Sequence, residues 1–198
     1  MKRESNVKVC SVNTLEKKAA FWWNNLEVQV KAAFLCTILW GIIGHGSAMF
    51  NKFSVHDDVA FTHSVGLTVT LGRWMLELVS RFEQLATVSQ HYSMPLVNGM
   101  VTIVCIAVTV SILVALFRIR SVVLSIAIGG ILVVNPAVTS TLGYMFTAPY
   151  YAVSLLMTVW GASLLCKNRT WYAYAIAVVC FICGLGIYQA YIPAAISI

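Results

Sequence analysis

The sequence predicts an all-helical integral membrane protein, and its composition, the length of its apolar runs and its charge distribution all favour this fold class. Sixty per cent of the 198 residues are hydrophobic and only 10% are charged, whereas a soluble domain is nearer half apolar and a quarter charged. Several uncharged runs reach the ~20 residues that a helix needs to cross a bilayer. Backbone groups in hydrocarbon must be bonded within their own segment, and the alternating pattern of a barrel is absent, so these runs are predicted to be helices.

The apolar runs place about five transmembrane helices in a membrane domain of residues 32–198. The expected spans are residues 32–50, 96–117, 121–135, 148–166 and 171–190. Asn135-Pro136 should end the third span, because proline lacks an N–H and the residue before it avoids helical geometry. An uncharged outer turn is then expected over Ala137–Ala148.

Residues 1–31 are predicted to form a cytoplasmic arm with an amphipathic helix. Asn13 and Glu16 have the spacing of a capping box, and apolar residues then recur every three or four positions. Trp22 and Trp23 suit the headgroup zone of a membrane, where amphipathic rings collect. The arm should therefore lie on the inner membrane surface.

The loop of residues 51–95 is the only long polar connection, and its second half predicts an interfacial helix over about residues 71–89. Arg73, Glu77 and Arg81 follow one another at i, i+4 spacing and can pair along one face. The opposite stripe is apolar: Leu71, Trp74, Met75, Leu78, Val79, Phe82 and Leu85. A helix with one charged face and one apolar face should lie flat at the outer membrane–water interface.

The net charge of +6 raises the possibility of nucleic-acid binding, but the distribution of charge favours a topological reading. Lys52, Arg73 and Arg81 fall in the loop of residues 51–95, and the other ten basic residues fall on the opposite side of the expected spans. Cytoplasmic loops carry an excess of lysine and arginine. The sequence thus predicts a cytoplasmic N-terminus, an extracytoplasmic loop and C-terminal end, and no nucleic-acid partner.

Two motifs within the spans are interpreted as packing. Cys180-Phe-Ile-Cys183 has the spacing of a redox or metal motif, but it lies in apolar sequence without a histidine or carboxylate nearby. His45 is the only ionisable residue, cysteines and tyrosines aside, in the expected spans, and we expect a hydrogen-bonded packing residue there and not a ligand.

The loop of residues 51–95 also holds the one chemical constellation of the sequence: His56, Asp57, Asp58 and His63. Carboxylates at a membrane interface are costly unless they are solvated, paired or used. Adjacent residues point in different directions in a helix or a strand, so the two aspartates should have different roles. Spacing alone also allows a solvated loop in which one aspartate caps the next helix. Two histidines and two aspartates could in addition attract a divalent cation.

Three short motifs in this order resemble a known family: His56-Asp57-Asp58-Val59, Gly72-Arg73-Trp74 and Tyr188-Gln189. They resemble the phage-type O-antigen glucosyltransferases, the glucosyl transferase II family, within the GT-C class of membrane glycosyltransferases. The resemblance runs from about Leu35 to Ile198. It implies a GT-C-like fold and transfer of glucose from a polyprenyl-phosphate carrier, undecaprenyl-phosphate glucose, to a lipid-linked surface polysaccharide outside the bacterial inner membrane. Neither a metal nor another cofactor is expected.

Full-length members of that family are longer. The resemblance therefore also implies that this chain corresponds to the N-terminal half of such an enzyme, with a second polypeptide as a candidate source of the missing spans.

The resemblance assigns roles to individual residues. Asp57 is the expected general base and Asp58 the second choice, or a residue that orients the site. Arg73 is the expected phosphate contact because its planar fork binds oxygen pairs; a salt bridge to Glu77 is an equal alternative. The remaining candidates are substrate contacts: His56 and His63, which a solvated loop would also explain, and Tyr188, Gln189 and Tyr191, which an aromatic belt would also explain.

Two other classes of function remain open at this stage. One is a non-enzymatic polytopic membrane subunit, either a component of a carrier-lipid flippase or a small transporter. The other is an inert fragment that only inserts. Transporters usually place ionisable residues within their spans, whereas here the charges cluster at one surface, which favours interfacial chemistry.

Overall fold

The computed structural model describes residues 16–51, 67–87, 94–167 and 170–198. Within these ranges the regular structure is helical, without a strand. Residues 16–25 form a short helix that precedes α2 (Val28–Asn51). The predicted all-α fold class is confirmed.

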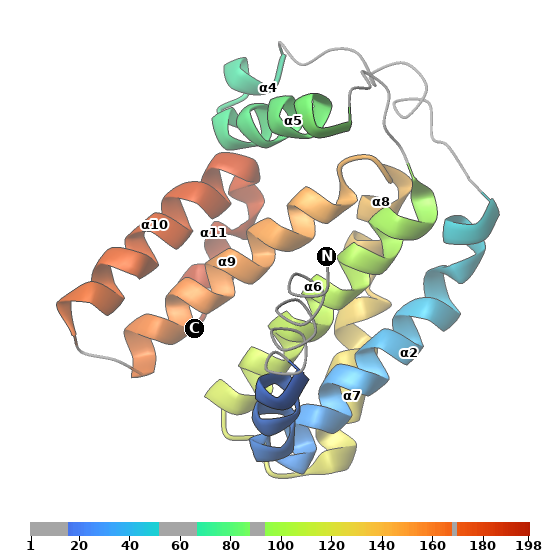
Figure 1. Cartoon of the computed structure of the whole chain (residues 1–198), viewed down its shortest axis with the longest axis vertical. Helices are drawn as coiled ribbons and strands as arrows, with labels where there is room; N and C mark the ends of the chain where they lie inside the picture. The colour runs from blue at the N-terminus through green and yellow to red at the C-terminus, as the bar shows by residue number, and fades with distance from the viewer. Residues whose placement is uncertain (1–15, 52–66, 88–93, 168–169) are drawn as a thin grey trace, which may run out of the picture.

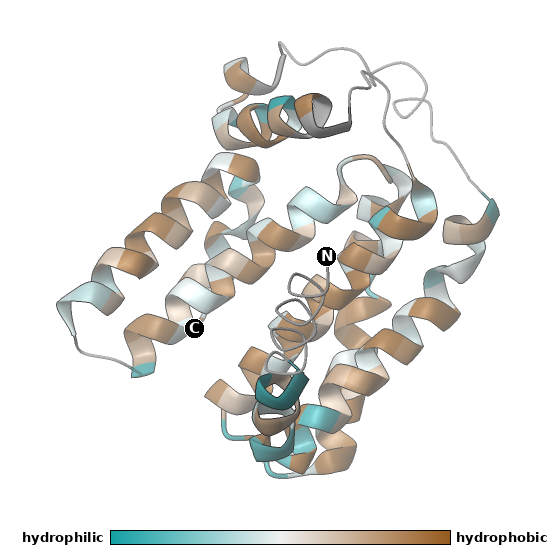
Figure 2. Cartoon of the chain, viewed as in Figure 1, coloured by the Kyte–Doolittle hydropathy of each residue, from teal (hydrophilic) through white to brown (hydrophobic). Residues whose placement is uncertain are grey.

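Among the described residues, three helices are long and apolar enough to cross a membrane: α2, α6 (Pro95–Leu116) and α9 (Ala148–Lys167). Figure 2 shows hydrophobic residues along most of their length. The chain is thus a membrane protein by the length and composition of its helices. Each helix begins or ends within about four residues of the expected span.

The third and fifth expected spans differ from the sequence prediction. The third is a bent pair, α7 (Val122–Val133) and α8 (Pro136–Gly143), which meet at 42° and count as a fourth span only if taken together. The fifth, α10 (Trp171–Ile187), is apolar but has 17 residues. The described part of the chain therefore has three spans, or four with the bent pair, where about five were predicted.

Asn135-Pro136 does end a helix, as predicted, but it also begins the next one. The Asn135 side chain accepts a hydrogen bond of 2.8 Å from the backbone N–H of Ala137 and so caps α8, and Pro136 occupies the first turn, where its missing N–H costs nothing. The expected outer turn over Ala137–Ala148 is therefore wrong as far as Gly143, and only residues 144–147 form a turn. An asparagine followed by a proline can therefore mark the start of the next helix as well as the end of the previous one.

The helices pack as neighbours in two groups that share α6. α2 packs on α6 and α7, and α9 packs on α6 and α10. Small residues allow close approach, as is common between membrane helices. A Cβ atom on Gly129 would lie 3.3 Å from the carbonyl oxygen of Ala33, and one on Gly161 would lie 3.1 Å from Cβ of Cys180. Cys180 is buried in this contact, in agreement with its predicted packing role.

Most buried hydroxyl groups bond within their own helix. The residues whose hydroxyl donates to the carbonyl four positions earlier include Thr37, Thr102, Thr109, Ser111, Ser125 and Thr158. Other buried polar side chains reach another element: Ser154 donates to the carbonyl of Gly184 at 2.6 Å, Asn98 donates to that of Met145 at 3.1 Å, and His45 Nε2 lies 2.8 Å from that of Val133. His45 is buried, so its predicted packing role is confirmed.

Two short segments position the candidate site. α4 (Leu67–Thr70) and α5 (Trp74–Thr87) lie across one end of α10 (Figure 1), and α5 contacts α10 directly. After α10 the chain forms η1 (Gln189–Tyr191) and α11 (Ile192–Ile196), which contacts α9.

The path of these last residues corrects one prediction. The carbonyl oxygen of Ile198 lies 4.0 Å from Sγ of Cys166, near the C-terminal end of α9. The last residues therefore return along α9 and do not leave the bundle at the outer end of α10. Tyr188 ends α10 in an extended conformation with φ −150°, which turns the chain back so that Ala194 and Ile198 line a small cavity together with apolar side chains of α6 and α9.

Candidate functional site

The turn that leads into α5 contains a glycine, Gly72, whose backbone conformation suits no other residue well. Gly72 has φ +76°, in the left-handed region that L side chains rarely adopt. Its N–H donates to the carbonyl of Val69 at 2.9 Å, and its carbonyl accepts a long hydrogen bond of 3.5 Å from Nε2 of Gln189. This turn fixes where the next residue, Arg73, points.

A second glycine allows α5 to dock on α10. A Cβ atom on Gly186 would lie 2.8 Å from the indole of Trp74 and 2.9 Å from Cβ of Met75. Only hydrogen fits there, so the start of α5 sits directly against the end of α10. Leu76 is also buried. The loop helix is therefore packed on the bundle at a defined place.

Arg73 points from α5 into a group of tyrosines. Its Nη1 donates a hydrogen bond of 3.2 Å to the hydroxyl of Tyr151 on α9. Its guanidinium carbon lies 5.1 Å from the ring centroid of Tyr188 and 6.0 Å from that of Tyr151. Both distances are within the range of cation–π attraction. The cation is thus held by two aromatic residues from two other segments.

The tyrosines also contact one another. The ring centroids of Tyr151 and Tyr188 lie 4.5 Å apart, and those of Tyr188 and Tyr191 lie 5.3 Å apart in an edge-on arrangement. Such pairs contribute beyond the area they bury. We call Arg73, Tyr151, Tyr188 and Tyr191 the Arg73 cluster.

Burial changes the acidity of one member of the cluster, Tyr191. Removal from water raises its pKa to about 12, and the neighbouring hydroxyls of Tyr188 and Tyr151 act in the same direction. The Tyr191 hydroxyl, protonated at neutral pH, can donate a hydrogen bond. Together with the guanidinium, it gives the cluster donors suited to an oxygen-rich, anionic ligand.

The structure brings four of the predicted site residues together. Arg73, Tyr188 and Tyr191 belong to the cluster, and Gln189 bonds to Gly72 beside it. Arg73, in the first loop, is more than 110 positions in sequence from the other three, which lie at the end of α10. The other four, His56, Asp57, Asp58 and His63, lie outside the described residues.

Tyr151 is a member that the sequence analysis missed. It stands three residues after the start of α9, in Ala-Pro-Tyr-Tyr. Paired tyrosines at the start of a span resemble an ordinary interfacial belt, and the motif carries no charge. Only the three-dimensional contact with Arg73 separates Tyr151 from such a belt.

The polar face of α5 differs from the prediction at Glu77. An exposed glutamate was expected, but Glu77 is buried, and it accepts a 2.9 Å salt bridge from Nε of Arg81. Arg73 instead lies over the ring of Tyr188 and donates to the hydroxyl of Tyr151. The face that carries Glu77 is thus turned toward the bundle.

The apolar stripe of α5 is exposed along much of its length, although Trp74 and Met75 in its first turn also contact Gly186 of α10. Trp74, Leu78, Phe82 and Leu85 are exposed, the last by 79%. An exposed row of this kind is what a helix at a membrane interface presents to the acyl boundary. Position and orientation relative to a bilayer stay a prediction.

The sequence profile of the glucosyl transferase GtrII family matches residues 46–198, more than three quarters of the chain. The chain belongs to the GtrII glucosyl transferase family. The match covers the whole Arg73 cluster and both glycines that dock α5. No curated protein and no solved structure gives a significant match.

Proposed function

We propose that this GtrII family member transfers glucose from undecaprenyl-phosphate glucose to a lipid-linked surface polysaccharide, the O-antigen of lipopolysaccharide, at the outer face of the bacterial inner membrane. The observation that carries the proposal is the Arg73 guanidinium held between Tyr151 and Tyr188 where the loop helix meets α10. Membership of the GtrII family supports glucosyl transfer as the activity, and the apolar helices support a substrate that is embedded in a membrane.

Arg73 would bind the phosphate of the carrier. An arginine has five N–H donors, and the hydrogen bond to Tyr151 uses one of them on Nη1. The others can bind two phosphate oxygens at once. Because the tyrosines already hold the side chain, less conformational freedom is lost when the phosphate binds.

The reaction needs a base more than an acid. The acceptor hydroxyl oxygen attacks the anomeric carbon of glucose, and the bond from that carbon to the phosphate oxygen breaks. The electron pair leaves with the phosphate, whose charge Arg73 neutralises, and the acceptor proton passes to Asp57. A carboxylate also favours the oxocarbenium-like transition state. Asp58 would orient the site, and His56 and His63 would contact phosphate or sugar hydroxyls.

The sugar would lie against the tyrosines. Tyr188 and Tyr191 offer aromatic faces, and the protonated hydroxyl of Tyr191 offers a donor. Gln189 would join them through its amide.

The proposed orientation places the Arg73 cluster outside the cytoplasm. It rests on the bias of basic residues toward the opposite helix ends. A membrane-impermeant thiol reagent added from outside should modify a cysteine introduced at Ser64 and leave Cys10 unmodified. Labelling of Cys10 alone would reverse the orientation.

The phosphate contact can be tested with two matched variants on α5. Arg73→Lys keeps the charge and loses the fork, and the KM for undecaprenyl-phosphate glucose should rise roughly 10- to 100-fold, as for loss of a hydrogen bond to a charged group. Arg81→Lys is the control, because that side chain is 70% exposed and, in the part of the chain that the structure describes, bonds to Glu77 within its own helix turn. Its KM should stay near wild type. Equal effects of the two changes would remove Arg73 from the phosphate site.

The base can be tested by Asp57→Asn, which keeps size but cannot accept a proton. Transfer should fall by ~10²–10⁴-fold, and Asp58→Asn should cost less. Wild-type transfer in both variants would leave the mechanism without its base. The assay should be run on native membranes and on the purified chain, because activity in membranes alone would indicate the proposed second polypeptide.

A further inference from the structure

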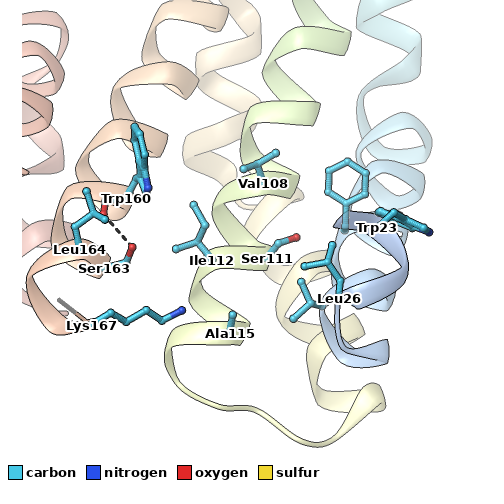
Figure 3. Close-up of a pocket in the computed structure, with 12 residues that line it drawn as sticks. Trp23, Leu26, Val108, Ser111, Ile112, Ala115, Trp160, Ser163, Leu164 and Lys167 are labelled. Atoms are coloured by element: carbon cyan, nitrogen blue, oxygen red, sulfur yellow. Dashed lines mark hydrogen bonds between the residues drawn. The ribbon is translucent and has the colours of Figure 1, made fainter. Parts of the chain in front are cut away.

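A groove lies at the end of the molecule opposite the Arg73 cluster. It has a volume of about 550 Å³ and lies between the helix of residues 16–25, α2, α6 and α9. Figure 3 shows Trp160 and Leu164 of α9 on one side of the groove, Trp23 on the other, and Ile112 of α6 between them. The volume is in the range of ligand pockets. Nothing in the proposed transfer reaction uses it.

The groove is well separated from the Arg73 cluster. Arg73 bonds to Tyr151, near the start of α9, and the groove ends at Lys167, sixteen residues later. At the helical rise this is roughly 24 Å along α9. The two sites therefore lie at opposite ends of one helix.

Lys167 gives the groove a cation at its mouth. The side chain leaves the end of α9 and reaches across toward α6, below Ile112 (Figure 3). The rest of the lining is apolar apart from Ser111 and Ser163, whose hydroxyls donate to backbone carbonyls of their own helix. A ligand that fits must therefore be an apolar chain with an anionic head.

The end of the bundle around the groove is rich in positive charge. Gln29 donates a 2.9 Å hydrogen bond to the carbonyl of Arg120, which places the start of α2 beside the turn between α6 and α7. The same helix ends carry Lys17, Lys18, Lys31, Arg118, Arg120 and Lys167, against Glu16 and Glu27. Clusters of this kind attract anionic lipids.

We propose that the groove binds an anionic phospholipid, with one acyl chain between α6 and α9 and the phosphate at the ammonium of Lys167. Trp23 and Trp160 both line the groove, and Trp160, seven residues and so roughly 10 Å before Lys167 on α9, would lie against the acyl chain. A zwitterionic lipid would gain less from the basic surroundings. The site differs from that of the carrier lipid, whose phosphate is assigned to Arg73, and it does not depend on the transfer reaction.

The test uses the full chain in vesicles of phosphatidylcholine that contain photoactivatable phosphatidylglycerol, with the reactive group on the acyl chain. Peptide mapping should locate labels on α6 and α9 beside Ile112 and Leu164. Unlabelled phosphatidylglycerol should compete, and unlabelled phosphatidylcholine should not. Lys167→Gln should lower labelling about fivefold, the effect of one basic residue at an anionic surface.

Two further variants separate the site from general attraction to the surface. Lys17→Gln removes the same charge from the same end but does not line the groove, so labelling should stay near wild type. Ser111→Leu fills the groove and should lower labelling without changing the charge. Circular dichroism and elution as a single species check that each variant is folded.

Three results would overturn the proposal. One is equal labelling by both phospholipids, and another is an equal loss from Lys17→Gln and Lys167→Gln. The third is competition by undecaprenyl phosphate at lower concentration than phosphatidylglycerol, which would make the groove a carrier site. Because no glucosyl transfer is measured, failure here leaves the proposed function intact.

Discussion

Replacing Gly72 by alanine should loosen the loop helix from the bundle. An L residue at φ +76° costs about 1–2 kcal/mol. The new Cβ would also lie 2.5 Å from Nε2 of Gln189, but that atom ends a flexible, exposed side chain and can move away. The loss of the 3.5 Å hydrogen bond from Gln189 to the Gly72 carbonyl adds little. Backbone strain should therefore account for most of the effect.

Amide hydrogen exchange measures this directly. If the amides of α5 exchange when the helix undocks, Gly72→Ala should speed their exchange roughly 5- to 30-fold, the factor that corresponds to 1–2 kcal/mol. Exchange in α6 should not change. Gly46→Ala in α2 is the control, because its Cβ would meet only the ring of Phe50 at 3.8 Å.

A double-mutant cycle separates strain from crowding. Gln189→Ala alone should alter exchange little, and Gly72→Ala with Gln189→Ala should exchange as fast as Gly72→Ala alone. If the double variant returned to the wild-type rate, the clash with Gln189 would be the cause and the argument from φ would be wrong. If Gly72→Ala had no effect, α5 would not depend on this turn at all.

The remaining predictions concern the bundle and the cluster. His45→Phe should lower the free energy of unfolding by about 1–3 kcal/mol, because the Val133 carbonyl loses its 2.8 Å partner in a buried place; unfolding in mild detergent measures it, and an unchanged midpoint would refute it. Gly129→Val should cost about 1–3 kcal/mol through crowding against Thr37 where α7 meets α2, and the same unfolding experiment would show no loss if the helices can separate freely. For Tyr191, the folded pKa of about 12 lies above the ordinary value of 10, so the folded state holds its proton longer and stability should fall as pH rises from 10 toward 12. Tyr191→Phe should flatten that slope, and an identical slope in the variant would contradict the assignment.

Much of the fold was predictable because membrane helices have a strong local signal. Apolar length alone located α2, α6 and α9, since a bilayer demands ~20 residues whatever the tertiary contacts are. The same rule failed for the third and fifth spans. Whether Asn135-Pro136 ends a span or begins a second helix depends on the bend that tertiary packing accepts, and a count of apolar residues cannot show it.

The candidate site was predictable in its charged residue and not in its surroundings. Arg73 stands out because charge is rare near the spans, and Gly72 is a plausible turn residue beside it. Tyr151 could not be selected, because tyrosines at span ends are common for reasons unrelated to a site. Glu77 was misplaced for a related cause: periodicity separates two faces of a helix but does not say that one polar residue will be turned toward the bundle.

The hydroxyl groups within the spans bear on how the protein enters the membrane. Because Thr37, Thr102 and Thr158 bond to carbonyls of their own helices, each span carries these polar groups already satisfied when it leaves the insertion machinery. Hydrocarbon then imposes no penalty for them on an isolated helix. Asn98, Ser154 and His45 differ, since their partners belong to other segments. Insertion can therefore proceed one helix at a time. The penalty for an incomplete bundle comes afterwards, when the helices join, because only then do these three side chains find their partners.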